Sequence, residues 1–162
     1  MIQIRITLPG ACRTKKTGSI FISKPFPRLI PGKPYRDWFD GIMTFKPLIL
    51  DQLRGDGVPL PITCPVQVSA LVYRDRRTGD LLGYLESIGD ALQAEAWSKP
   101  EDGKKQKMIR NGLGIIENDS EIISWDGSRL MLDKDNPRVE LTITTMEEGT
   151  QSSLELTEAE TF

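Results

Sequence analysis

The sequence predicts an α+β domain in which a mixed β-sheet is covered by two main helices. Three segments, residues 2–8, 65–73 and 138–145, alternate apolar and polar side chains with the two-residue period of half-buried strands. Two others, residues 35–53 and the stretch after Gly79, space their apolar residues three and four apart, as amphipathic helices do. The order of strand, helix, strand, helix and paired strands is typical of α+β proteins.

Length and composition predict one globular domain that does not enter a membrane. The chain has 162 residues, of which 38% are hydrophobic and 27% are charged. No apolar run approaches the roughly 20 residues that a membrane-spanning helix requires. The first ten residues, MIQIRITLPG, lack a basic segment followed by an apolar one, so we expect no signal peptide and a cytoplasmic location.

The absence of histidine excludes several catalytic classes at once. Neither a Ser-His-Asp nor a Cys-His site can be built, and two cysteines cannot form a four-cysteine zinc site. Any hydrolytic chemistry must therefore depend on carboxylates. Carboxylates that bind a hard cation point to Mg²⁺, with Mn²⁺ as an alternative.

Charge is distributed unevenly along the chain, although the net charge is only −2. Eight basic residues and no acidic ones precede Asp37, whereas residues 148–162 contain four glutamates and no basic residue. These blocks predict an N-terminal region that binds a polyanion and an acidic, disordered tail over residues 148–162. The alternative is that both ends are merely solvated.

The elements follow in order from local patterns. Residues 2–8 form the first strand, and residues 11–34 form a long basic loop with a short strand at the letters IFI. The first helix covers residues 35–53, and Pro47 kinks or splits it. Residues 65–73 form a second strand, and Asp126-Gly127 between alternating runs predicts a hairpin. We expect residues 97–114 to be an exposed, mobile, positively charged insertion.

The helix after Gly79 carries two neighbouring columns of side chains. An apolar stripe is formed by Leu81, Leu85, Ile88 and Leu92. The column beside it has a four-residue spacing and contains Leu82, Glu86 and Asp90. Leu82 is therefore expected beside the core rather than at its centre.

Four stretches in order resemble the RusA family of Holliday junction resolvases, across roughly residues 1–147. They are RTKKTGSIF, IPGKPYRDW, GDLLGYLESIGDAL and IIENDSEI, the last one before a closing LTITTMEE strand. The resemblance implies a homodimeric, Mg²⁺-dependent endodeoxyribonuclease that resolves four-way DNA junctions by paired symmetric nicks. Such enzymes are often encoded by phages or prophages.

The resemblance assigns two acidic ligands and also shows three departures from the family pattern. Asp80 matches the first acidic ligand, and Asp119 matches the second Asp of an Asp-Asp pair. Leu82 replaces a carboxylate, Gly83 replaces an amide, and Glu86 replaces a lysine of the catalytic type. A leucine cannot coordinate a cation, so one reading is a catalytically degenerate protein that binds DNA junctions.

Helix geometry offers a second reading in which Glu86 compensates for the missing carboxylate. Glu86 lies four residues after Leu82, so the two side chains leave the same face about 6 Å apart at Cβ. We hypothesise a metal cluster of Asp80, Glu86 and Asp119, with Glu117 as a further candidate ligand. Purely structural roles stay open: Asp80 is a good helix N-cap, Asp119 suits a turn, and Glu86 with Asp90 suits a solvated face.

Basic side chains near these acids are candidates for contacts with DNA phosphates, which position a duplex without reading its sequence. The candidates are Arg13, Lys15, Lys16, Lys33, Arg36, Arg74, Arg76, Arg77, Lys104, Lys105 and Lys107. A third possible function, from another class, is an interaction module whose basic loop binds an acidic protein.

Overall fold

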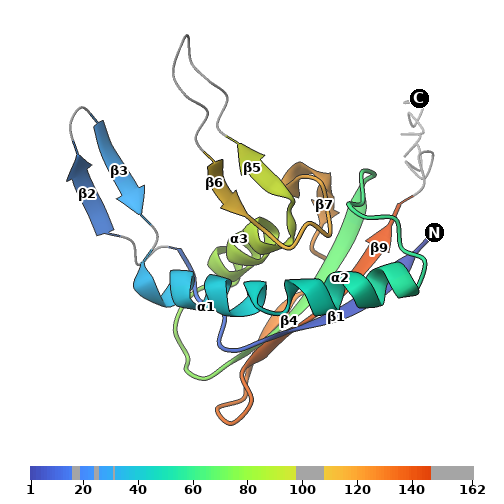
Figure 1. The fold of residues 1–162 in the computed structure, drawn as a ribbon. Coiled ribbons are helices and arrows are strands. Elements are labelled where there is room, and N and C mark those ends of the chain that lie inside the picture. The colour runs from blue at the N-terminus through green and yellow to red at the C-terminus, as the bar shows by residue number, and fades with distance from the viewer. Residues whose placement is uncertain (16–18, 24–25, 31, 98–107, 147–162) are drawn as a thin grey trace, which may run out of the picture.

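A five-stranded mixed sheet forms the centre of the fold (Figure 1). The computed structural model describes residues 1–15, 19–23, 26–30, 32–97 and 108–146. Strand β1 (Gln3–Pro9) pairs with β9 (Arg138–Thr145), which pairs with β4 (Val66–Arg74), and both pairings are antiparallel. Strands β7 (Ile122–Ser124) and β8 (Arg129–Leu132) run parallel to β4 along its other edge. The predicted α+β class with a mixed sheet is confirmed.

One face of this sheet is buried and the other is half-exposed. Strand β4 buries Val66, Val68, Ala70 and Val72, while the residues between them are partly accessible. The same alternation holds in β1 and β9, as expected for strands with a core on one side only. Buried residues of the sheet and of three α-helices form one core cluster.

The predicted first helix is two helices, as the position of Pro47 indicated. Helix α1 (Lys33–Met43) ends before Thr44, and α2 (Lys46–Gly55) begins after Phe45. Pro47 lies in the first turn of α2, where its missing N–H breaks no helical hydrogen bond. The described part of the chain therefore has three α-helices instead of the two main helices expected.

Helix α3 (Leu81–Leu92) has the apolar stripe that its sequence predicts. Leu85, Ile88 and Leu92 are buried, and Leu81 packs against the core at its edge. Leu82 is 76% exposed, because it lies in the neighbouring column. Asp80 is the N-cap, and its Oδ1 accepts a hydrogen bond from the backbone N of Gly83 at 2.7 Å.

The hairpin predicted at Asp126-Gly127 is wrong, although the turn itself exists. Gly127 has a φ of 80°, as this turn requires, but β7 and β8 do not pair with each other. Both strands instead pair with successive parts of β4. The gap between them is closed by Ser128, whose Oγ accepts the backbone N–H of Ala70 at 2.9 Å.

Two further antiparallel pairs were only partly predicted. In the basic loop, β2 (Ser19–Ser23) pairs with β3 (Phe26–Ile30), and later β5 (Glu95–Trp97) pairs with β6 (Met108–Asn111). Both pairs project away from the main sheet in Figure 1. We expected residues 97–114 to be an exposed, mobile insertion, but Leu113 in this range is fully buried. The predictions for Lys16, Lys104, Lys105, Lys107 and the acidic tail fall outside the described residues.

Two further observations concern the cysteines and membrane spans. Cys12 and Cys64 are both free thiols. Within the described ranges, none of the helices combines the length and apolar character needed to cross a membrane.

Candidate functional site

Glu86 and Asp119 meet at one pocket, which we call the carboxylate pocket. It has a volume of about 260 Å³ and is lined by Leu82, Leu85, Glu86, Gly89, Asp119, Ile122 and Trp125. Glu86 comes from α3, and Asp119 begins a short 3₁₀ helix, η1 (Asp119–Glu121). The two elements meet at Gly89, where an added Cβ atom would be in ordinary van der Waals contact, 3.8 Å from the Cβ of Asp119. The structure therefore brings together two of the four predicted metal ligands.

The other two predicted ligands do not line this pocket. The Asp80 carboxylate caps α3 at its N-terminus, so the structural role considered for it is present. Glu117 is exposed, and its backbone N donates to the carbonyl of Ile62 at 2.9 Å. Among the described residues, no group of three or more His, Cys, Asp or Glu side chains is arranged to hold a metal ion.

Lys15 supplies a positive charge directly beside Glu86. Its Nζ lies 3.3 Å from Oε1 of Glu86 and also forms an ion pair with Asp90. Partial burial by itself lowers the pKa of Lys15, but the hydrogen bond to Asp90 and the two carboxylate charges raise it above its ordinary value. Lys15 was predicted as a phosphate contact, and nothing in the sequence indicated that it reaches α3. Asp90, in this pair, has the structural role expected of it.

The donor atoms of the carboxylate pocket fit Mg²⁺ better than a metal that needs a full protein cage. Mg²⁺ keeps several waters and is held through one or two carboxylates together with substrate phosphates. Glu86 and Asp119 supply two such carboxylates, and both are exposed. Leu82 lines the same pocket and offers no ligand atom.

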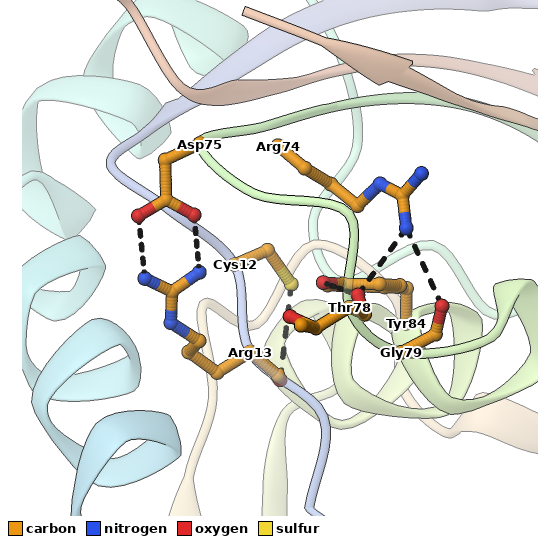
Figure 2. Close-up of polar contacts among 7 residues, drawn as sticks. All are labelled: Cys12, Arg13, Arg74, Asp75, Thr78, Gly79 and Tyr84. Atoms are coloured by element: carbon orange, nitrogen blue, oxygen red, sulfur yellow. Dashed lines mark hydrogen bonds and ion pairs between the residues drawn. The ribbon is translucent and has the colours of Figure 1, made fainter. Parts of the chain in front are cut away.

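Arg13 is held by an acidic partner that the sequence did not reveal. Its Nη1 and Nη2 each donate to one carboxylate oxygen of Asp75 at 2.7 Å, in the forked arrangement seen in Figure 2. The hydrogen bond from Arg13 holds the pKa of Asp75 below its ordinary value and raises that of Arg13. Arg13 thus ties the segment after β1 to the turn after β4.

Arg74 is also engaged within the protein. Its Nη1 donates to the carbonyls of Thr78 and Gly79 at 3.2 and 3.4 Å, and its guanidinium lies 6.0 Å from the ring centroid of Tyr84. The hydroxyl of Tyr84 donates to the same Thr78 carbonyl at 2.7 Å (Figure 2). These bonds fix the turn that leads into Asp80. Gly79 has a φ of 84° there, and a Cβ atom would lie 2.9 Å from the Tyr84 ring.

Three of the predicted DNA contacts line a second hollow, which we call the basic cleft. It has a volume of about 630 Å³ between α1 and the segment after β1, and its charged lining residues are Arg13, Lys33, Asp37 and Arg76. Nζ of Lys33 lies 2.6 Å from Asp37 in an exposed pair. Arg36 and Arg77 are exposed but do not line this cleft.

Comparison with protein-family models and with curated proteins finds no match for this sequence.

Proposed function

We propose that this chain is a metal-dependent endodeoxyribonuclease that acts on four-way DNA junctions in the cytoplasm, as its resemblance to RusA-type resolvases implies. The observation that supports this proposal is the meeting of Glu86 and Asp119 at one pocket. Glu86 stands where the family pattern has a lysine, and the cation beside it comes from Lys15.

The residues of the carboxylate pocket have separate tasks in this proposal. Glu86 and Asp119 would hold Mg²⁺ or Mn²⁺, which activates water and stabilises the charge on the leaving oxygen when bound. Lys15 holds the Glu86 carboxylate in place through their ion pair, and it adds positive charge close to the scissile phosphate. Exposed arginines such as Arg36, Arg76 and Arg77 position the DNA backbone.

We further propose that the active form is a homodimer. A four-way junction has two-fold symmetry, and two equivalent nicks require two equivalent sites. A symmetric dimer supplies one site to each nicked strand.

A junction-binding protein without nuclease activity is the second candidate. Leu82 favours it, because this exposed apolar side chain lines the carboxylate pocket where the family pattern has a ligand. An apolar group beside a metal site removes one ligand and raises the cost of holding charge there.

Cleavage of a labelled four-way junction tests the nuclease directly. With Mg²⁺ or Mn²⁺, the native protein should produce paired nicks, and D119N and E86Q should each lose at least about 100-fold in rate, the loss of a transition-state interaction worth about 3 kcal/mol. Tight junction binding without nicks in either metal would contradict the nuclease and support the second candidate. A shallow salt dependence of DNA affinity would contradict both and point to an acidic protein partner.

Leu82→Asp separates the two candidates further. Because Leu82 is exposed, an aspartate there should fold normally and place a third carboxylate at the pocket. We expect tighter Mn²⁺ binding, measured by calorimetry, and faster cleavage of the junction. Leu48→Asp is a matched control, since Leu48 is an exposed leucine on α2 that does not line the pocket. Equal behaviour of both variants would argue against a metal at this place.

A further inference from the structure

The carboxylate pocket has an apolar wall that metal binding does not use. Besides its two carboxylates, the pocket is lined by Leu82, Leu85, Gly89, Ile122 and Trp125. A metal ion with its waters and a phosphate interacts with polar atoms, so it leaves this wall uncovered. Leu82 is 76% exposed and Trp125 is half-buried, so part of the wall is open to solvent. The pocket therefore offers a ligand both an acidic surface and an apolar one.

Trp125 is held next to Asp119, because both side chains pack against α3 at the same point. A Cβ atom built at Gly89 would lie 3.8 Å from Cζ2 of Trp125 and 3.8 Å from Cβ of Asp119. These two atoms are therefore at most twice that distance apart. The backbone of Trp125 is fixed as well, since its carbonyl accepts from the backbone N of Ser128 at 3.1 Å in the turn after β7. The indole is thus fixed beside a candidate metal ligand.

A nucleotide has the chemistry that matches both surfaces. Its phosphate can bind a metal ion held by carboxylates, and its base has flat faces that stack on aromatic side chains. One sugar joins the two groups, so the base lies close to a metal that holds the phosphate. The pocket has a volume of about 260 Å³, below the roughly 300–1,000 Å³ of pockets that enclose drug-sized ligands. It therefore suits a single base.

We propose that Trp125 stacks on the base of the nucleotide whose phosphate is held at the carboxylate pocket. Unstacking a base costs least where the duplex is already interrupted, as it is at a branch point. Trp125 would therefore select branched DNA over a continuous duplex, a role that the carboxylates do not supply. This inference rests on the proposed function, because it takes the ligand to be a DNA junction.

Trp125→Leu tests this role, because leucine keeps an apolar side chain but has no aromatic face. Binding is followed by the anisotropy of labelled DNA with Ca²⁺ in place of Mg²⁺, since both cations take oxygen ligands, and gels check that the strands stay intact. We expect W125L to bind a four-way junction about 10-fold more weakly and a linear duplex with unchanged affinity. W125F should retain most of the junction affinity.

Tyr73→Leu is the matched control. Tyr73 is also a half-buried aromatic residue, but it lies on β4 and does not line the carboxylate pocket. Y73L should bind both the junction and the duplex as the native protein does. A loss of junction affinity equal to that of W125L would overturn the inference.

Junctions that lack one base identify the stacked nucleotide. In each substrate, one nucleotide beside the branch point is replaced by an abasic one, which keeps the sugar and the phosphate. At one position, the native protein should lose about 10-fold in affinity, whereas W125L should bind the abasic and the intact junction equally. If W125L loses the same factor on every substrate, Trp125 does not contact a base.

Tryptophan emission provides a test that does not depend on how well W125L folds. Stacking on a base should quench the emission of Trp125, so the native protein should lose more emission on junction binding than W125F does. Equal quenching in the two proteins would overturn the inference.

The outcomes separate this inference from the function on which it rests. Junction binding and cleavage that W125L leaves unchanged would overturn the stacking role, while the proposed function would stand. Absence of any junction binding by the native protein would overturn both.

Discussion

Arg13 and Lys15 are close in sequence but have different ionic partners. Arg13 is engaged by Asp75 through two hydrogen bonds, whereas Lys15 lies between Glu86 and Asp90 on α3. The two hydrogen bonds to Asp75 fix the orientation of the Arg13 guanidinium. Arg13 and Lys15 therefore organise the site before they meet any ligand.

The Arg13–Asp75 pair should make stability depend on pH. The pKa of Asp75 lies below its ordinary value of 3.8, because Arg13 donates to its carboxylate. The pair therefore stabilises the fold above pH 3.8, and this contribution disappears as the pH falls through the lowered pKa. Asp75→Asn should lower the free energy of unfolding by about 1–3 kcal/mol at neutral pH. Urea unfolding at neutral and acidic pH measures this difference, which should shrink in acid.

Asp37→Asn is the control for this prediction. The Lys33–Asp37 pair is exposed on both sides, and exposed pairs contribute less than about 1 kcal/mol. Equal losses of stability in the two variants, or a loss in Asp75→Asn that persists in acid, would contradict the role given to Asp75.

At the scale of the elements, one side chain, that of Ser128, completes the hydrogen bonding along the edge of β4 between β7 and β8. Ala70 is fully buried, and its N–H donates to Oγ of Ser128, where neither short strand supplies a backbone acceptor. Ser128→Ala should leave this N–H without its partner and cost about 1–3 kcal/mol of stability. Thermal unfolding measures the loss, and hydrogen exchange at the Ala70 amide should become faster.

Ser124→Ala provides the comparison for this prediction. Oγ of Ser124 accepts from the backbone N of Asp126 at an exposed turn, where water can replace it. Its removal should change stability by less than about 0.5 kcal/mol. If both serine variants unfold alike, the hydroxyl of Ser128 does not complete the sheet edge.

The sequence predicted correctly those strands and helices that are determined by residues close together in the chain. Alternation predicted β1, β4 and β9 because one face of each strand is buried, and Pro47 predicted the division of the first helix. The Asp126-Gly127 turn was predicted as well, but a turn does not determine which strand its flanks pair with. Strand β3 was missed because Pro27 disfavours a strand in sequence, yet an outer strand tolerates it.

Only the part of the candidate site that lies on α3 could be predicted from the sequence, because the helical repeat shows which side chains share a face. A four-residue spacing placed Leu82 and Glu86 on one face of α3, and both line the carboxylate pocket. That Asp119 joins them while Asp80 caps the helix depends on how η1 packs against α3. Long-range pairs such as Arg13 with Asp75, 62 residues apart, leave no periodic signal in the sequence.

For the whole molecule, the two ends of the chain have opposite charge. The N-terminal region is basic, and the basic cleft gathers two of its cations, Arg13 and Lys33, together with Arg76 of the turn after β4. Residues 148–162 carry four glutamates and no basic residue, so removing them changes the net charge from −2 to +2. A negatively charged tail competes with DNA phosphates for the same cations wherever it can reach them.

Truncation after residue 147 should therefore strengthen DNA binding, and most strongly at low salt. Charges interact over about 30 Å at 0.01 M salt but over only about 3 Å at 1 M, so the gain should fade as salt rises. Anisotropy of a labelled four-way junction across a salt series measures it. A full-length chain with Glu148, Glu155, Glu158 and Glu160 replaced by glutamine separates charge from chain length. It should bind as tightly as the truncated protein if charge is the cause. Unchanged affinity in both proteins would mean that the tail does not act on the basic surface.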